Sequence, residues 1–499
     1  MLNIPRLKQS VTVFCAGLLA VTGFAPWSLF PSVVFALAVL FLTWQRTPEK
    51  GAAAWLGFIF GMGLLTGVLD WIYIALHDYG DMSFLPALAA SLLFIAVSAA
   101  LPAFAGWLQA RFHAPVWLRL VLIMPALWVM TEWLRGLLFT GFPWLTLGYS
   151  QVPTSLLAGY APIIGVYGVS LVVAVSAGLL ALLWQVRWSK QGRAALLALI
   201  LLWGVGAMLR TVQWTEPTGE PIKVALLQGN IPQELKFRKE KLVSTLEIYR
   251  RLVLHSDARL IVLPETALPL LRHELPESYR EILSDHARQM GGDLLIGAFE
   301  REQGQFYNSV FTLGTAQSQS YRKNHLVPFG EFIPLRPVLG WFINEVLHIP
   351  MSDLARGGAR QQVLRVAGQR VAVQICYEDV FGEEVIRYLP EATLLVNVSN
   401  DAWYGKSHAA IQHNQIAQMR ALESGRMMLR ATNTGVTSII DRNGAILQML
   451  PQHEEGVLSG WAQGYVGSTP YVRWGNAAML MLISIMLVCA RALSSSRKN

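Results

Sequence analysis

Charged residues are scarce in this chain of 499 residues. They make up 14% of it, whereas a soluble globular chain has roughly 25%, so the composition argues against a soluble protein. Cysteine is rarer: there are three, and Cys15 and Cys489 lie in apolar stretches near the two ends, which excludes a disulfide framework. Motifs for a metal or a nucleotide, such as HExxH, Walker A and GxGxxG, are also missing. We therefore expect no metal ion and no cofactor.

Apolar residues take the place of the missing charges. They make up 53% of the chain, and the mean hydropathy is +0.40. The long apolar stretches cover residues 10–25, 31–44, 52–76, 84–110, 116–134, 158–186, 193–209 and 475–493. Since about 20 apolar residues in a helix cross a hydrocarbon core about 30 Å thick, we predict a bundle of about eight transmembrane helices. Residues 1–210 would hold seven of them, and 471–499 would form the last helix and a short tail.

The basic residues predict the orientation. A formal net charge of +8 could indicate a nucleic-acid partner, but the cations lie in short loops between apolar stretches, so we expect no nucleic acid. They occupy alternate loops: Arg6 and Lys8, Arg46 and Lys50, Arg111 and Arg119, Arg187, Lys190 and Arg193, and Arg491, Arg497 and Lys498. Because Lys and Arg mark the cytoplasmic side, both termini are predicted to be cytoplasmic. A cleaved signal peptide is the alternative for the first span, but no A-x-A site follows it.

Residues 211–470 have the pattern of an outward-facing α/β domain. Short apolar strands are predicted at 223–230, 259–266, 293–299, 308–313, 371–376 and 394–398, with a hairpin over 436–441 and 445–449. Helices are predicted at 235–255, 276–290, 383–389 and 408–429. Strands that alternate with helices favour one α/β domain in which helices cover sheets on both sides.

Three polar residues stand at the ends of predicted strands, where α/β proteins usually carry their sites. These are Glu265, Lys323 and Cys376. Taken alone, each has an ordinary interpretation: a charge at the start of a helix, a solvated lysine and a small buried thiol, respectively. Together they form a coherent set. A carboxylate in an apolar pocket has a raised pKa and can take the thiol proton, and an ammonium stabilises the thiolate and a later oxyanion. The backbone N–H of Tyr377 would be a second oxyanion donor.

Several segments around these residues resemble a known family. LPET (263–266), YRKNHLVPFGEFIP (321–334) and QICYEDVF (374–381) resemble the catalytic segments of the nitrilase superfamily. GNIPQ (229–233), GFPW (141–144) and NVSNDAWYG (397–405), together with the membrane spans, are similar to its membrane-embedded branch, the apolipoprotein N-acyltransferase family. The resemblance covers essentially the whole chain, and it implies a nitrilase-like αββα sandwich beside a multispan helical bundle.

The resemblance also implies residue roles. Glu265 would be the general base, Cys376 the nucleophile and Lys323 the oxyanion stabiliser, with support from Glu331, Tyr377 and Glu378. The candidate substrate and lid residues are Phe237, Trp403 and Trp144, and Phe237 stands where close relatives would have Trp.

The family's reaction would be ping-pong acyl transfer, the last step of bacterial lipoprotein maturation. An acyl chain would pass from a phospholipid, phosphatidylethanolamine above all, to Cys376 and then to the N-terminal amine of a diacylglyceryl-cysteine apolipoprotein. The resemblance implies a monomer in the bacterial inner membrane, in contact with the lipid bilayer, with a periplasmic catalytic domain.

Two other functions stay open from the residues alone. One is a membrane-tethered amidase with the same three residues, and the other is a receptor or transporter whose outer domain binds a ligand without catalysis. The carboxylates after Cys376 also have two interpretations. Glu378 and Asp379 could form a turn or cap the helix at 383, or they could turn away from the sulfur to position Lys323 and the neighbouring loop.

Overall fold

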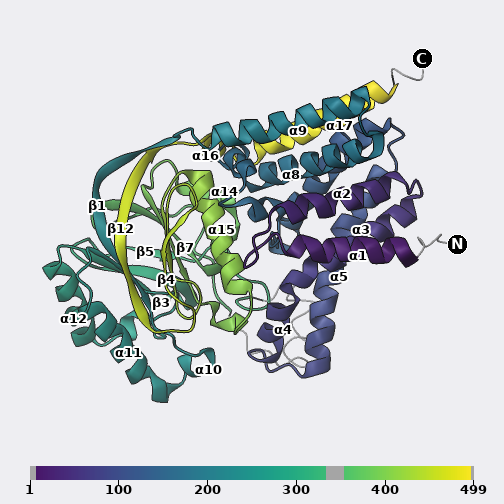
Figure 1. Ribbon diagram of the computed structural model, residues 1–499. Coiled ribbons are helices and arrows are strands. Elements are labelled where there is room, and N and C mark those ends of the chain that lie inside the picture. Colours follow the sequence, from purple (N-terminus) through teal and green to yellow (C-terminus); the bar gives the residue numbers. More distant parts are fainter. Residues whose placement is uncertain (1–6, 333–352, 496–499) are drawn as a thin grey trace. The chain divides into compact units, whose positions relative to one another are not determined.

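The computed structural model describes residues 7–332 and 353–495, and it divides into two compact units (Figure 1). The first unit comprises Met1–Tyr73, Phe84–Val212 and Arg473–Asn499, and the second comprises Ile74–Ser83 and Gln213–Val472. Arg6, Arg497 and Lys498 of the charge pattern lie outside the described residues, as do positions 333 and 334 of the second motif.

The first unit is helical. Its main helices are α1 (Leu7–Val21), α2 (Pro31–Gln45), α3 (Lys50–Leu65), α4 (Leu69–His77), α5 (Phe84–Gln109), α7 (Met124–Arg135), α8 (Ala161–Val186), α9 (Lys190–Leu209) and α17 (Ala477–Ser495). In the described part of the chain, six helical stretches are long and apolar enough to cross a membrane. The stretches that form α1 and α2 give helices of 15 residues, shorter than the usual span. The predicted helical membrane bundle is confirmed.

Glycines let the first helices approach closely. A Cβ on Gly17 of α1 would lie 2.3 Å from the carbonyl oxygen of Phe60 in α3, and one on Gly57 of α3 would lie 2.3 Å from that of Pro102 in α5. Both distances are too short for a side chain. Small residues at such crossings are typical of membrane helices, which associate through close backbone packing.

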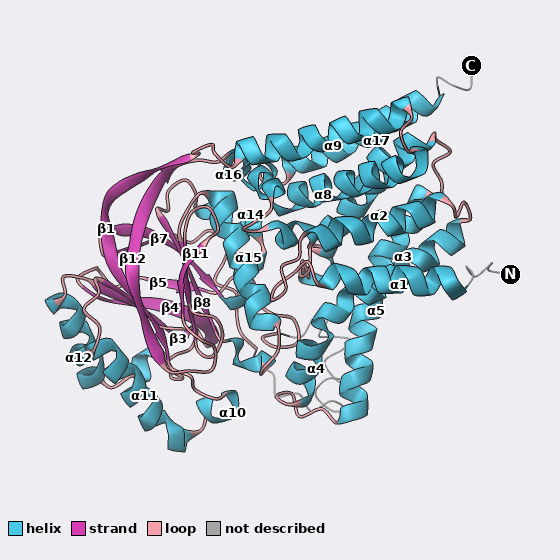
Figure 2. Cartoon of the chain, in the orientation of Figure 1, coloured by secondary structure: helices cyan, strands magenta, loops and turns pink. Residues whose placement is uncertain are grey.

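The second unit contains two six-stranded sheets, drawn in magenta in Figure 2. One has the order β12-β1-β2-β3-β4-β5 and the other β11-β10-β9-β8-β7-β6. Their strands are β1 (Thr215–Gln228), β2 (Leu260–Val262), β3 (Asp293–Glu302), β4 (Gln305–Gly314), β5 (Ser320–Arg322), β6 (Leu364–Val366), β7 (Gln369–Ile375), β8 (Leu394–Ser399), β9 (Met428–Thr432), β10 (Ser438–Ile440), β11 (Ile446–Met449) and β12 (Gly456–Gly467). The sheets contact each other through β1 with β9 and β4 with β7.

Helices cover the outer faces of both sheets. Buried residues of α11 (Lys239–Leu254) and α12 (Glu277–Gln289) form one apolar core with β1, β2 and β3. Buried residues of α14 (Gly382–Val385) and α15 (Ala409–Ser424) form a second core with β7, β8 and β9. The predicted nitrilase-like αββα sandwich is therefore confirmed. Strands β2 and β7 run parallel to their neighbours β1 and β8, so each sheet has an edge at which carboxyl ends gather.

The structure differs from the sequence prediction in one helix and adds two features that were not predicted. The helix predicted over 408–429 ends at Ser424, where Gly425 adopts a left-handed φ of 64° as a C-cap, and Met428–Thr432 forms the buried strand β9 instead. Strand β12, rich in glycine, was not predicted. Residues 74–83, which include the end of α4 and the segment before α5, group with the second unit.

Candidate active site

The three predicted catalytic residues come together at strand ends. Glu265 follows β2, Lys323 directly follows β5, and Cys376 directly follows β7. The side chains are buried, with exposed fractions of 7% for Glu265, 1% for Lys323 and 7% for Cys376. The first two residues come from one sheet and the third from the other, so the site lies where the two sheets of the sandwich meet.

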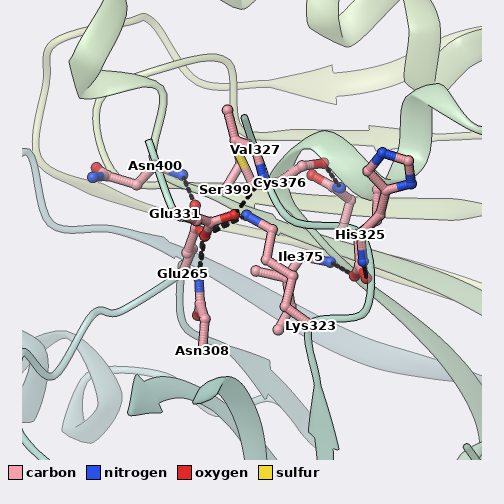
Figure 3. A network of polar contacts seen from close by, with 12 residues as sticks. Glu265, Asn308, Lys323, His325, Val327, Glu331, Ile375, Cys376, Ser399 and Asn400 are labelled. Carbon is pink, nitrogen blue, oxygen red and sulfur yellow. Dashed lines mark hydrogen bonds and ion pairs between the residues drawn. The ribbon is translucent and has the colours of Figure 1, made fainter. Parts of the chain in front are cut away.

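A compact ion-pair network joins Glu265, Lys323 and Glu331 (Figure 3). The Lys323 Nζ atom is 2.9 Å from Glu331 Oε1 and 3.3 Å from Glu265 Oε1. Asn308 Nδ2 donates to Glu265 Oε1 at 2.7 Å and to Glu331 Oε1 at 3.3 Å. The backbone N–H of Asn400 donates to Glu265 Oε2 at 2.9 Å. Both oxygens of Glu265 are therefore held in fixed directions.

Electrostatics keep the network charged. Burial alone would raise the pKa of Glu265, but the ammonium groups of Lys323 and Lys236 outweigh burial and hold that pKa below its usual value. Burial likewise opposes the charge on Lys323, but Glu265 and Glu331 raise its pKa well above the usual value. The expected raised pKa of a carboxylate in an apolar pocket is thus wrong for Glu265, because the pocket also contains lysines and hydrogen-bond donors.

Cys376 begins the short turn η8 (Cys376–Val380) with a left-handed φ of 55°. This conformation costs a residue with a Cβ roughly 1–2 kcal/mol, so the surrounding structure must impose it. Asn397 Nδ2 does so in part by donating to the Cys376 carbonyl oxygen at 3.0 Å. Burial and the Glu265 charge raise the pKa of the thiol above its ordinary value, whereas Lys323 and a hydrogen bond with Ser399 act in the opposite direction. The resting sulfur is therefore a neutral thiol.

Glu378 joins the turn after Cys376 to the segment after Lys323. Its carboxylate accepts hydrogen bonds from the backbone N–H groups of Ile375 at 2.7 Å, Asn324 at 2.6 Å and His325 at 3.1 Å, and from the Tyr321 hydroxyl at 3.0 Å. Burial raises the pKa of Glu378 to about 7, although these N–H groups limit the rise. The contacts agree with the hypothesis that Glu378 positions the lysine loop.

Asp379 belongs to a buried network that the sequence did not predict. Asp379 Oδ1 lies 2.8 Å from His413 Nε2, and Asp401 Oδ1 lies 3.2 Å from His413 Nδ1. Arg430 bridges the same two carboxylates at 3.3 Å and 3.0 Å, and it donates to Asn397 Oδ1 at 2.6 Å. The signal for this network was a charged residue, Arg430, in an otherwise apolar strand, but that strand was not predicted and its first two residues were assigned to the helix over 408–429.

Lys236 is a second residue that the sequence analysis did not assign. It ends α10 (Gln233–Lys236), directly after the GNIPQ motif, and only 2% of it is exposed. Its Nζ donates to the backbone carbonyl oxygen of Glu265 at 3.1 Å. The sequence could not indicate a role for Lys236, because most lysines are exposed to solvent and a position next to a motif does not predict burial.

The supporting and lid candidates differ in placement. Tyr377 is 6% exposed, and its ring lies 5.3 Å from that of Phe381. Phe237 and Trp403 are 53% and 43% exposed, and the Trp403 ring lies edge-on to Tyr79 at 6.2 Å. Both side chains are thus open to a ligand.

Trp144 belongs to the helical unit, in which it is 1% exposed and stacks on Phe142 at 6.3 Å. Arg135 donates to the Trp144 carbonyl oxygen, and Glu132 accepts from the Leu147 N–H at 3.1 Å. These contacts fold the GFPW loop onto its own unit. The assignment of Trp144 as a substrate contact stays a prediction.

The fold and site define a membrane protein with a carbon-nitrogen hydrolase domain. The family model described as Carbon-nitrogen hydrolase matches residues 223–471, and the one described as Apolipoprotein N-acyltransferase N-terminal domain matches residues 16–179. A curated protein named Apolipoprotein N-acyltransferase from Nitrosomonas europaea is 51% identical over 98% of both chains. A protein of the same name from Methylococcus capsulatus is 44% identical over 97% of this chain and 96% of its own. The chain belongs to the apolipoprotein N-acyltransferase family, as its motifs predicted.

Proposed function

We propose that this protein transfers an acyl chain from a membrane phospholipid to the N-terminal amine of diacylglyceryl-cysteine apolipoproteins. The family membership supports an acyltransferase. The observation that carries the finer proposal is a buried thiol in a left-handed turn, next to an ion-paired carboxylate and lysine. Membrane helices in the same chain keep it in the bilayer that contains both lipid substrates.

In the first half-reaction Cys376 is the nucleophile and Glu265 the general base. The sulfur forms a bond to the ester carbonyl carbon while the thiol proton passes to the Glu265 carboxylate. Because burial disfavours a free thiolate, proton transfer accompanies attack and does not precede it. The ester C–O bond then breaks, Glu265 returns the proton to the departing alkoxide, and a lysophospholipid leaves an S-acyl thioester on Cys376.

In the second half-reaction the apolipoprotein amine attacks the thioester carbon. An N–C bond forms and the C–S bond breaks. One amine proton passes through Glu265 to the sulfur, which restores the thiol. The lysophospholipid leaves before the amine reacts with the S-acyl cysteine, so the cycle is ping-pong, and neither half-reaction needs an oxidant or a cofactor.

Lys323 and the backbone N–H of Tyr377 have the role of oxyanion donors in this mechanism. The ammonium is held by two carboxylates, so it is oriented before charge develops on the substrate oxygen, which is the condition for electrostatic stabilisation. Glu331 lies beside Glu265 and holds the same ammonium, and Glu378 fixes the segment that follows the lysine.

The location completes the proposal. The alternation of basic loops supports a periplasmic position for residues 211–470, at the inner membrane. Exposed Phe237 and Trp403 supply apolar surface for acyl chains, and phosphatidylethanolamine is the proposed donor. We propose that the protein acts as a monomer.

Mass spectrometry of the purified full-length protein tests the intermediate. After incubation with phosphatidylethanolamine, we expect an acyl adduct on Cys376 that is stable until a diacylated lipopeptide is added. A gel shift of the lipopeptide should accompany loss of the adduct, and Cys376→Ser should abolish both. Lipopeptide acylation that continues without an adduct on Cys376 would refute the ping-pong mechanism.

The two alternative functions give different results. A membrane-tethered amidase would hydrolyse small amides and leave the lipopeptide unchanged. A receptor or transporter would keep its function in Cys376→Ala, because binding does not need the thiol.

A further inference from the structure

Lys236 is a buried cation for which the proposed mechanism has no role. Its ammonium carries three donors, and among the described residues its one hydrogen bond goes to the Glu265 carbonyl oxygen at 3.1 Å. A buried ammonium is unfavourable unless nearby negative charge compensates for it. Burial lowers the pKa of Lys236 to about 8, although Glu265 raises it, as Cys376 does when its thiol is ionised.

The segment that carries Lys236 is fixed to the site by side chains. Asn400 Nδ2 donates at 2.7 Å to Oε1 of Gln233, the last residue of the GNIPQ motif. Asn433 Nδ2 donates to Asn400 Oδ1 at 3.0 Å. The backbone N–H of the same Asn400 donates to the Glu265 carboxylate. Lys236 and Asn400 therefore hold Glu265 by its backbone and by its side chain, and the two holding groups are themselves connected.

The ion-pair network of Glu265, Lys323 and Glu331 contains more negative than positive groups. Glu265 and Glu331 contribute two carboxylates to the network, and Lys323 contributes one ammonium. Without another positive group the site would be negative even before the thiol loses its proton, and negative charge opposes a thiolate. A protonated Lys236 makes the set neutral, in a buried region where charges interact more strongly than in water.

We infer that Lys236 is a positioning residue of the acyl-transfer site. Its ammonium holds the Glu265 turn through the carbonyl oxygen and supplies the second positive charge, which makes the Cys376 thiolate and the tetrahedral oxyanion accessible. This inference rests on the proposed function, because it requires Cys376 to be the nucleophile.

Three substitutions separate the charge from the hydrogen bond. Lys236→Met removes both, Lys236→Gln keeps a donor for the Glu265 carbonyl oxygen, and Lys236→Arg keeps the donor and the charge. Each is made in a full-length chain whose Cys15 and Cys489 are replaced by Ser, so that Cys376 is the single thiol. Lys239→Met is the matched control, because Lys239 lies three residues further along the chain and is exposed.

The first measurement is the rate of Cys376 alkylation by iodoacetamide as a function of pH. We expect Lys236→Met and Lys236→Gln to lower the rate at pH 7 about 10- to 100-fold and to move the profile to higher pH, since a nearby cation favours the thiolate. Lys236→Arg should stay within a few-fold of the parent, and Lys239→Met should match it. Acyl transfer should lose kcat while KM for the phospholipid changes little.

The opposite pattern would overturn the inference. If Lys236→Gln or Lys236→Met unfolds at a lower temperature but keeps the parent alkylation profile, Lys236 is structural only. If Lys236→Met does not fold, the comparison of Gln with Arg still decides, because equal profiles exclude a role for the charge. Failure of the proposed function is seen separately, as absence of an acyl adduct on Cys376 in the parent protein.

Discussion

The buried network of Asp379, Asp401, His413 and Arg430 predicts a large effect of Arg430→Met. Arg430 is fully buried and bridges Asp379 and Asp401. Methionine fills part of the volume but leaves two buried carboxylates with His413 as the one remaining cation of the network. Removal of one partner from a buried ion pair costs about 3–5 kcal/mol. For a domain of roughly 250 residues each kcal/mol shifts Tm by about 2–4 °C, so we expect Tm to fall by roughly 6–20 °C.

Thermal unfolding in detergent, followed by tryptophan fluorescence, measures this shift. Arg250→Met is the control, because Arg250 forms an exposed pair with Glu247 on one helix, and exposed pairs contribute about 0–1 kcal/mol. Arg430→Met also removes the hydrogen bond from Arg430 to Asn397, and Asn397 in turn holds the Cys376 carbonyl oxygen. The acylation rate should therefore fall more than the loss of stability alone explains. An unchanged Tm for Arg430→Met would refute the conclusion that the network stabilises the sandwich.

Three further predictions follow from the same contacts. Glu331→Gln removes one of two carboxylates that hold the buried Lys323, so kcat for acyl transfer should fall about 100-fold, and Tm should fall too because a buried ammonium loses a charged partner; a normal kcat would contradict the positioning role. Glu378→Gln turns one acceptor into a donor that faces the Ile375 N–H, so Tm should drop by the equivalent of about 1–3 kcal/mol, and a neutral substitution would count against the clamp. Burial and Arg430 lower the pKa of His413, but Asp379 and Asp401 raise it more. Because the pKa of His413 is higher in the folded than in the unfolded state, its charge stabilises the fold fully below pH about 6.5, the ordinary His pKa. This stabilisation is lost as pH rises through the folded-state pKa. The difference in Tm between the parent and His413→Gln should therefore shrink from pH 6 to alkaline pH, and a constant difference would argue against a charged imidazole.

The features that sequence predicted are those encoded locally. A helix needs about 20 apolar residues to cross a bilayer. Apolar runs of about that length therefore indicate membrane helices from the sequence alone. A reactive residue directly after a buried strand has its position set by that strand, which is why Glu265, Lys323 and Cys376 could be expected to lie near one another. The residues themselves then select the chemistry.

The missed features depend on contacts between distant segments. Arg430 lies in MLRAT, just beyond the end of the predicted helix at 429 and outside every predicted strand, and its partners are 29 and 51 residues away. Lys236 became interpretable only when the Glu265 carbonyl oxygen was found beside it. The charge of Glu265 is likewise a property of the assembled pocket, because the two lysines that lower its pKa come from different segments.

The same assembled contacts explain why two carboxylates can lie so close to Cys376 in the sequence. The charges that raise the pKa of the Cys376 thiol are those of Glu265 and Asp401, whereas its immediate neighbours Glu378 and Asp379 are not among the main causes. Glu378 accepts hydrogen bonds from the lysine segment, and Asp379 pairs with a histidine and an arginine beneath the turn. Each carboxylate thus ties the turn to a different part of the sandwich and turns its charge away from the sulfur. Two opposed anchors on consecutive residues are an efficient way to impose the left-handed conformation that Cys376 adopts, because neither anchor can relax without displacing the other.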